Sequence, residues 1–228
     1  MKTIEELKCS IVDINYIIEN MIRENGLYCL LGEAKVGKSA LALQIANSVC
    51  NGIPFLNLKT SKTPILYLST EMNPSKTISR INFMKCNLKE NDFLYTFPED
   101  NMTQLSILKV EKEISEFKEK YNGKLVFIDM FNGINFESYY DLNNYQDMSQ
   151  NIFPQLRRLC NNYNVTIIIV HHLNRKGKSL GSTAIDTCVD GKIALKQDEN
   201  IKQGKCDIKV TKEYNDFLEE KTDKTIKI

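Results

Sequence analysis

Arginine is scarce in this chain, and features typical of several protein classes are missing. Only five of the 228 residues are arginine, namely Arg23, Arg80, Arg157, Arg158 and Arg175. The formal net charge is +1, so no global field attracts nucleic acid or a membrane, and any such binding has to be local. Because no long apolar run is present, we expect neither a signal peptide nor a transmembrane span, and no membrane partner.

The cysteine and histidine patterns argue against further classes of protein and of site. The seven cysteines form no C-x-x-C pair and several fall in apolar runs, so we expect buried, reduced thiols and a cytoplasmic location. The two histidines, His171 and His172, are adjacent and have no cysteine at ligand spacing, which argues against a zinc site. No nucleophile elbow or catalytic triad pattern appears.

Short apolar runs alternate with helical stripes along most of the sequence. The runs occupy 27–31, 65–68, 125–128, 165–170 and 192–195, and helix-period stripes cover 107–121 and 145–163. This alternation predicts an α/β fold with a parallel sheet flanked by helices on both faces. Segments 206–211 and 224–228 alternate apolar and polar residues and predict a C-terminal antiparallel extension. Pro154 predicts a kink or division in the second stripe.

The chain length suits one domain with a sizeable core. We assign 26–228 to this domain and 1–25 to an N-terminal lead-in segment, where a helix and a strand are expected. No internal repeat or low-complexity linker interrupts the domain.

One motif stands out at the end of the first run. It reads Gly32-Glu33-Ala34-Lys35-Val36-Gly37-Lys38-Ser39 and fits G-x-x-x-x-G-K-[ST], the phosphate-binding loop of nucleoside triphosphatases. Lys38 supplies a cation for the β- and γ-phosphates and Ser39 a hydroxyl for Mg²⁺. A helix over 40–50 follows, and its N-terminus adds partial positive charge. We therefore expect ATP and Mg²⁺ to bind along the motif and at Ala40.

Two further runs end in an acid. Asp129 closes the run 125–128, the place where phosphate-loop enzymes hold the water shell of Mg²⁺. Glu71 follows the run 65–68 and suits a residue that orients or deprotonates the attacking water. By position alone, an exposed surface glutamate explains Glu71 better.

These motifs together resemble those of a known family. The stretch Ser69-Thr70-Glu71-Met72-Asn73-Pro74, with Arg80 farther on, resembles the segment that carries the catalytic glutamate of DnaB-type replicative helicases. The pair His171-His172 and the stretch Gly181-Ser182-Thr183-Ala184-Ile185-Asp186 resemble RepA-type plasmid helicases. The resemblance runs from about residue 26 to the C-terminus and implies a RecA-like ATPase fold.

The resemblance also implies roles for single residues. Lys38 and Ser39 would bind phosphate and Mg²⁺, Glu71 would be the catalytic base, and Asp129 the Walker B acid. His172 would sense the γ-phosphate and couple it to the loop 173–182. That loop carries Arg175, Lys176 and Lys178 and would contact single-stranded DNA.

Other interpretations of the DNA-binding segment stay open. Without the family context, a solvated turn explains the loop 173–182 better. A second candidate lies at 131–145, where the aromatic residues Phe131, Phe136, Tyr139 and Tyr140 are available to stack on bases. Nearby acids would repel phosphate, so this segment has less weight.

One position departs from the family pattern. RecA-like rings complete each active site with basic residues from the next subunit, which DnaB-type helicases carry as Lys-x-Arg. Lys212 matches the lysine, but Tyr214 occupies the arginine position. A lysine stabilises transferred charge without the guanidinium fork. The resemblance thus implies a homo-oligomer, expected to be a hexameric ring, with Lys212 as the group supplied in trans.

Three functions are compatible with these motifs. The first is an ATPase acting on single-stranded DNA, a RepA- or DnaB-like replicative helicase of a mobile element. The second is a nucleotide-switched regulator or loader that lacks motor activity. The third is a small-molecule kinase, which the scarcity of arginine and the Glu71 motif disfavour.

Overall fold

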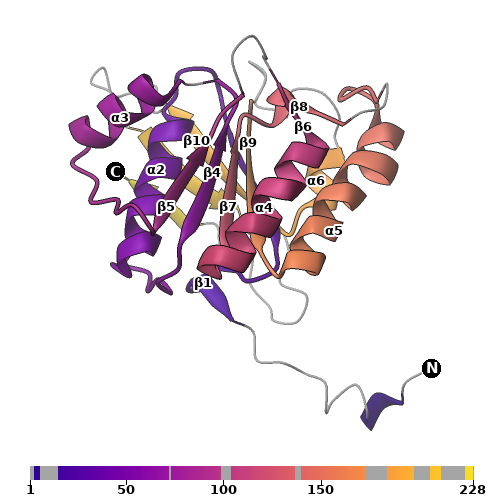
Figure 1. The fold of residues 1–228 in the computed structure, drawn as a ribbon, viewed down its shortest axis with the longest axis horizontal. Helices are drawn as coiled ribbons and strands as arrows, with labels where there is room; N and C mark the ends of the chain where they lie inside the picture. Colours follow the sequence, from indigo (N-terminus) through magenta and orange to yellow (C-terminus); the bar gives the residue numbers. More distant parts are fainter. Residues whose placement is uncertain are drawn as a thin grey trace.

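An eight-stranded sheet forms the centre of the molecule (Figure 1). The computed structural model describes residues 3–5, 15–71, 73–98, 104–136, 140–172, 184–197, 206–211 and 224–227, with backbone alone from 196 onward. In spatial order the strands are β12 (Lys224–Lys227), β11 (Cys206–Thr211), β10 (Gly191–Gln197), β3 (Leu27–Gly32), β9 (Thr166–His172), β7 (Leu125–Asp129), β4 (Ile65–Ser69) and β5 (Phe93–Thr96).

The strands from β10 to β5 are all parallel, whereas β10, β11 and β12 pair in antiparallel fashion. This arrangement confirms the predicted parallel sheet with a C-terminal antiparallel extension. In the parallel part, Gly32 pairs with His172, and Asp129 pairs with both Val170 and Ser69. The carboxyl ends of β3, β9, β7 and β4 therefore meet at one edge of the sheet.

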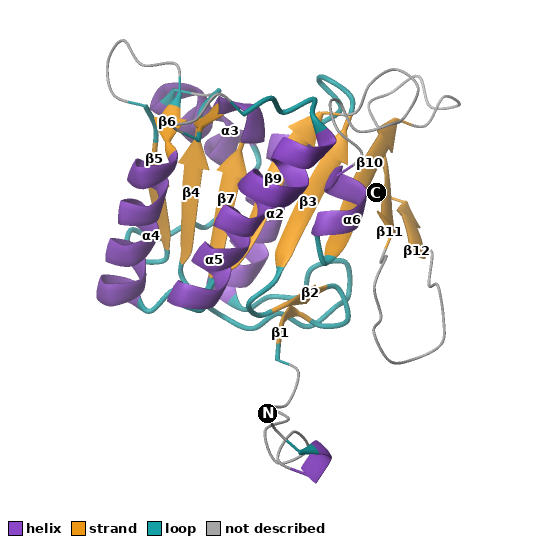
Figure 2. Cartoon of the chain, turned by 90° about the vertical axis from the view of Figure 1, so that its right-hand side faces the viewer, coloured by secondary structure: helices purple, strands orange, loops and turns teal. Residues whose placement is uncertain are grey.

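Helices cover both faces, as the near-continuous apolar strands require. One face packs against α2 (Lys38–Asn51) and α3 (Pro74–Phe83), and the other against α4 (Ile107–Tyr121), α5 (Phe153–Tyr163) and α6 (Ala184–Cys188). Figure 2 shows the sheet from the side that α4, α5 and α6 cover.

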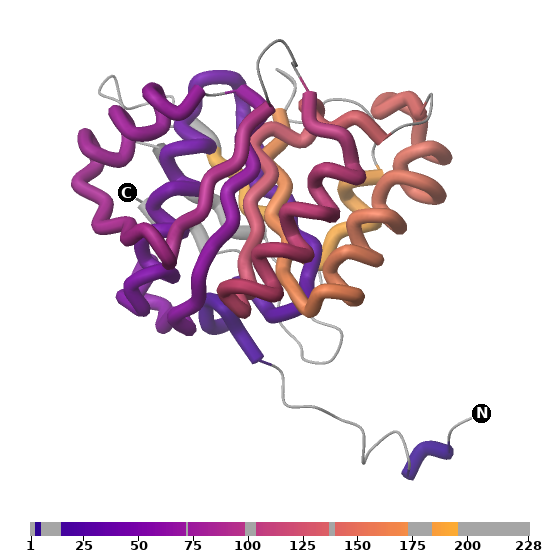
Figure 3. The backbone as a smooth tube through the Cα atoms, in the orientation of Figure 1, coloured from indigo at the N-terminus to yellow at the C-terminus, as the bar shows by residue number. Residues whose placement is uncertain are grey.

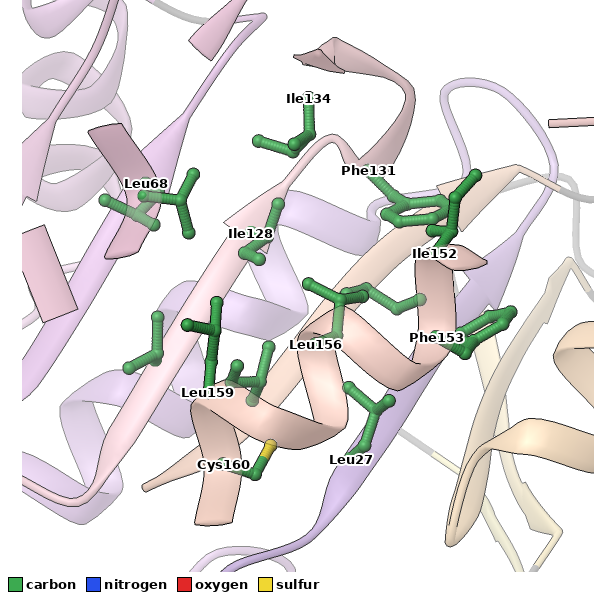
Figure 4. Close-up of a cluster of buried hydrophobic side chains, with 14 of the residues drawn as sticks. Leu27, Leu68, Ile128, Phe131, Ile134, Ile152, Phe153, Leu156, Leu159 and Cys160 are labelled. Carbon is green, nitrogen blue, oxygen red and sulfur yellow. The ribbon is translucent and has the colours of Figure 1, made fainter. Parts of the chain in front are cut away.

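Alternate residues of each strand enter the two cores. On β7, Val126 and Ile128 pack under α4 and α5, whereas Phe127 faces α2. Figure 4 shows part of the first core, with Ile128 of β7 beside Leu156 and Leu159 of α5. Asp129 lies two residues after Phe127, at the end of the strand. Because side chains alternate between the two faces of a strand, its carboxylate is on the same face as Phe127.

The second helical stripe is divided, as Pro154 predicted. A π-helical segment, η2 (Asp147–Ile152), precedes α5, and Pro154 is the second residue of that helix. Proline is tolerated there because the first turn of a helix leaves its N–H groups without intrahelical partners. α4 and α5 lie side by side on the sheet (Figure 3).

The expected lead-in segment contains a hairpin. Strands β1 (Tyr16–Ile18) and β2 (Ile22–Arg23) pair in antiparallel fashion, and Ile17, Ile18 and Ile22 are fully buried in the core shared with α2. A second small sheet pairs β6 (Leu105–Ser106) with β8 (Ile134–Asn135).

The described cysteines agree in part with the expectation of buried thiols. Cys29, Cys50 and Cys160 are buried, whereas Cys86 and Cys188 are half-buried, and all five are free thiols. Burial raises the pKa of Cys50 and of Cys160 to about 12, so these thiols stay protonated and unreactive. Within the described residues, no helix combines the length and apolar character needed to cross a bilayer.

Candidate active site

The phosphate-loop motif joins β3 to α2, as the sequence predicted. Helix α2 begins at Lys38, directly after Gly37, whose φ of 106° lies in the left-handed region that favours glycine. A Cβ on Gly32 would lie 2.7 Å from Val36 Cγ1 and 2.9 Å from the carbonyl oxygen of Leu195. The loop therefore needs glycine at both motif positions, and it leaves the N-terminus of α2 facing the sheet edge.

Lys38 lies inside this loop with its side chain fully engaged. Its Nζ donates to the carbonyl oxygens of Gly32 at 3.0 Å and Glu33 at 2.9 Å, and to Nδ1 of His172 at 3.0 Å. Burial lowers the pKa of Lys38, and the nearby carboxylates of Asp129 and Glu71 oppose that effect. A desolvated ammonium with three neutral acceptors is well placed to exchange some of them for phosphate oxygens.

His172 connects Lys38 with Glu71. Because an ammonium has no lone pair, Nδ1 of His172 has to be the acceptor, and the ring proton sits on Nε2. Nε2 lies 3.8 Å from Oε1 of Glu71. Burial, and then the charge of Lys38, lower the pKa of His172, so the ring is neutral at neutral pH.

Glu71 and Asp129 are held together by the residue between β4 and Glu71. The backbone N–H of Thr70 donates to the carbonyl oxygen of Asp129 at 2.7 Å. The Thr70 hydroxyl donates to the Met130 carbonyl and accepts from the Met130 N–H, both at 3.0 Å. Three hydrogen bonds thus fix the end of β4 to the end of β7. Glu71 follows with its side chain 54% exposed, which leaves the carboxylate accessible to water.

Asp129 is buried, with only 1% of its surface exposed. Burial raises the pKa of its carboxyl, while the hydroxyls of Tyr67 and Ser39 act to lower it. The hydroxyl of Tyr67 donates to Oδ2. The other oxygen, Oδ1, has no hydrogen-bond partner among the described residues. A buried carboxylate oxygen without a donor beside a serine hydroxyl fits the water shell of a hard cation such as Mg²⁺.

The structure brings most of the predicted site residues to one place. The phosphate loop with Lys38 and Ser39, the acids Glu71 and Asp129, and His172 share one sheet edge. The predicted DNA contacts Arg175, Lys176 and Lys178, and the predicted trans lysine Lys212 with its neighbour Tyr214, lie outside the described residues.

The alternative prediction, that the two phenylalanines of the segment 131–145 stack on bases, is wrong. Phe131 is fully buried and Phe136 is 6% exposed, and both belong to the core under α4 and α5. Phe131 also packs edge-on against His171, with ring centroids 5.6 Å apart. Neither phenylalanine ring is available to a base. Of the two tyrosines in the segment, Tyr139 lies outside the described residues, and Tyr140 is half-buried against the same core.

Sequence reasoning missed two residues of the site. Tyr67 sits within an apolar strand, where a tyrosine looks like ordinary core, and its partner Asp129 is 62 positions away. Thr70 gave no signal beyond its place before Glu71. Their roles became visible only once β4 and β7 were paired.

Comparison with known proteins agrees with this geometry. Residues 2–178 match the AAA_25 family, described as an AAA domain. The chain belongs to this family. No curated protein sequence matches it.

Two solved structures share the fold of this AAA-domain protein at low identity. One is a structure described as an ATPase domain, which is 13% identical, with a TM-score of 0.67, over 98% of this chain and 90% of that one. The other is a KaiC-like protein, PH0186 from Pyrococcus horikoshii OT3, which is 15% identical, with a TM-score of 0.59, over 92% and 87% of the two chains. The AAA-domain protein therefore has the RecA-like ATPase fold that its motifs predicted.

Proposed function

We propose that this protein hydrolyses ATP at the sheet edge described above, with Mg²⁺ bound near Ser39 and Asp129. The observation that carries the proposal is the convergence of Lys38, His172, Glu71 and Asp129 at the carboxyl ends of adjacent parallel strands. Ligands of open α/β sheets bind at this end. Family membership supports a nucleotide as the ligand.

Phosphate binding falls to the loop and Lys38. The backbone N–H groups from Gly32 to Ala40 and the N-terminus of α2 donate to the phosphate oxygens. Lys38 exchanges one or more of its three present acceptors for the β- and γ-phosphates. Bound Mg²⁺ supplies charge neutralisation, and Asp129 Oδ1 and the Ser39 hydroxyl are the groups that would hold it or its water.

Glu71 acts as the general base. Its exposed carboxylate takes a proton from a water molecule whose oxygen forms the new bond to the γ-phosphorus. The bond from that phosphorus to the bridging oxygen breaks, and ADP leaves with the electron pair. Thr70 keeps Glu71 at a fixed position relative to Asp129.

His172 serves as the sensor. In the present arrangement it accepts a hydrogen bond from Lys38 and directs Nε2 toward Glu71. A γ-phosphate that engages Lys38 would release Nδ1 and let the ring reorient. Because His172 ends β9, its movement passes directly into the chain that follows, the loop 173–182.

That loop is the proposed contact with single-stranded DNA, through Arg175, Lys176 and Lys178. With motor coupling through His172, the protein would be a RepA- or DnaB-like replicative helicase of a mobile element, assembled as a homo-oligomeric ring. Its support is the sequence resemblance, together with the place of the loop directly after the sensor.

A second candidate function differs from the helicase only in the coupling between ATP hydrolysis and movement on DNA. Tyr214 stands where the helicases carry an arginine, and a weakened trans group favours a nucleotide-switched regulator or loader without motor activity. In that case ATP would still be hydrolysed, but DNA would not accelerate turnover.

Turnover with and without single-stranded DNA tests the proposal. We expect DNA to accelerate ATP hydrolysis, and a variant with Arg175, Lys176 and Lys178 changed to alanine to lose that response while keeping ATP binding. Its DNA affinity should fall and depend less steeply on salt. The exposed lysines Lys59, Lys62 and Lys85, replaced together, form a control with the same loss of charge.

Each other outcome has its own meaning. Hydrolysis that DNA does not affect supports the regulator. Phosphate transferred to an added metabolite would favour a kinase. Absence of ATP binding and hydrolysis would reject the ATPase itself.

A further inference from the structure

Tyr67 is a buried tyrosine whose hydroxyl contacts the site. It lies on β4 with no exposed surface. Its ring packs against Phe93, Tyr95 and Phe127, with centroid distances of 5.8, 5.9 and 5.6 Å. Aromatic neighbours on the two flanking strands hold the ring in one orientation, so its hydroxyl has a fixed position.

That hydroxyl donates to Oδ2 of Asp129 on the neighbouring strand. The bond distinguishes the two carboxylate oxygens. Oδ2 is satisfied by Tyr67, whereas Oδ1 is also buried and has no partner in the described part of the chain. A carboxylate turned away from the Tyr67 hydroxyl would lose this bond in a medium where an unpaired polar group is costly.

We propose that Tyr67 is a positioning residue, which holds the Asp129 carboxylate so that Oδ1 faces the water shell of the bound cation. The inference rests on the proposed function, because it needs Mg²⁺·ATP at this site. Packing alone does not require the hydroxyl, since phenylalanine would fill the same space among Phe93, Tyr95 and Phe127. A phenol deep in a core is favourable only with a hydrogen-bond partner.

The competing explanation is purely structural, namely that the tyrosine satisfies a buried carboxylate and no more. The two explanations differ in one measurable quantity. A positioning residue changes how strongly the cation contributes to nucleotide binding. A structural residue changes only the free energy of unfolding.

The test compares Tyr67→Phe with Tyr95→Phe. Tyr95 stacks on Tyr67, and its hydroxyl pairs with Oγ1 of Thr77 at 2.8 Å, so the control removes a hydroxyl from the same aromatic cluster without removing the Asp129 bond. Binding of a fluorescent ADP analogue is titrated against free Mg²⁺, and bound Mn²⁺ is followed by electron paramagnetic resonance. Neither readout needs hydrolysis.

For Tyr67→Phe we expect the half-saturating Mg²⁺ concentration to rise by about fivefold or more, because a hydrogen bond to a charged group is lost. Nucleotide affinity in EDTA should stay at the parent value. Turnover at saturating Mg²⁺ should fall less than turnover at limiting Mg²⁺. In a background of Asp129→Asn, adding Tyr67→Phe should have little further effect, since Tyr67 acts through that carboxylate.

Equal Mg²⁺ dependence in the parent, Tyr67→Phe and Tyr95→Phe would overturn the inference and leave the ATPase proposal intact. The same conclusion follows if Tyr67→Phe does not fold, because the hydroxyl then serves stability. A parent protein that binds no nucleotide at any Mg²⁺ concentration would instead reject the proposed function.

Discussion

The ammonium group of Lys38 donates a 3.0 Å hydrogen bond to Nδ1 of His172. This contact links the phosphate loop to the last residue of the neighbouring strand. It places the proposed sensor against the group that a γ-phosphate would engage, and it fixes the neutral tautomer of the ring. Several consequences can be measured.

The first prediction concerns Lys38 itself. Lys38→Ala should lower ATP turnover by about a hundredfold or more, since a preorganised cation at the transferred phosphate is lost. Nucleotide affinity should also fall. The domain should stay folded, because the ammonium that is removed is itself desolvated and one of its acceptors belongs to the exposed Glu33. Steady-state kinetics and thermal unfolding check this, with the exposed Lys76→Ala as control. A variant that turns over at the parent rate would show that 32–39 is not the active loop.

The second prediction separates binding from chemistry. Glu71→Gln should bind Mg²⁺·ATP but lose turnover by about a hundredfold, the scale of general base catalysis. Asp129→Asn should instead reduce the gain in ATP affinity that Mg²⁺ provides. Isothermal titration with a non-hydrolysable ATP analogue and single-turnover assays distinguish the two, and Glu90→Gln serves as an exposed control. Near-parent turnover in Glu71→Gln would move the base to another residue.

The third prediction is a pH dependence of stability. Burial lowers the pKa of His172 below its usual 6.5, so the folded protein takes up this proton at lower pH than the unfolded chain. Its stabilising contribution is present above about pH 6.5 and is lost as the pH falls toward the folded pKa. His172→Gln removes the titration. The variant should therefore lose less stability than the parent between about pH 7.5 and 5, as urea unfolding measures. Parallel curves would show that His172 does not titrate differently on folding.

The fourth prediction concerns Thr70. Thr70→Val keeps the shape but removes the hydroxyl, so the N–H and carbonyl of Met130 lose their partner. We expect a loss of about 1–3 kcal/mol in the free energy of unfolding. Turnover should fall even where the variant is folded, because Glu71 is no longer fixed. Thr70→Ser retains the hydroxyl and should restore most of both quantities. If valine and serine behave alike, the hydroxyl is dispensable.

The site shows what sequence patterns can predict. The phosphate loop is local, because one motif dictates the turn, the helix start and the lysine. Asp129 and Glu71 follow apolar runs, and parallel strands bring such ends to the same edge. Position alone favoured an exposed surface glutamate at Glu71, and only the family resemblance implied a catalytic role for it.

Contacts that depend on register were not accessible. The bond from Tyr67 to Asp129 requires β4 and β7 to be neighbours in one particular alignment, with both side chains on the α2 face. The base-stacking prediction for Phe131 failed for a related reason. It follows Asp129 and precedes polar residues, which suggests exposure, yet a 3₁₀ turn over Phe131–Gly133 returns its ring to the core.

The last prediction concerns assembly. A RecA-like site between subunits is incomplete in a monomer, so turnover per chain should rise with protein concentration, and native mass measurement with ATP and single-stranded DNA should show the ring. Lys212 is the proposed trans group. Lys212→Ala should bind ATP normally but hydrolyse it poorly, because the charge that forms on the transferred phosphate loses a cation from the neighbour.

Mixing two inactive variants tests the trans arrangement more directly than either single variant. Lys212→Ala combined with Glu71→Gln should recover part of the activity, because some interfaces then pair an intact Glu71 with an intact Lys212. Each variant alone, at the same total protein concentration, gives the baseline turnover. If Lys212 is instead one more solvated lysine, the single variant should turn over at the parent rate. Turnover that does not depend on concentration, with no recovery on mixing, would reject the trans arrangement and favour a monomeric nucleotide switch.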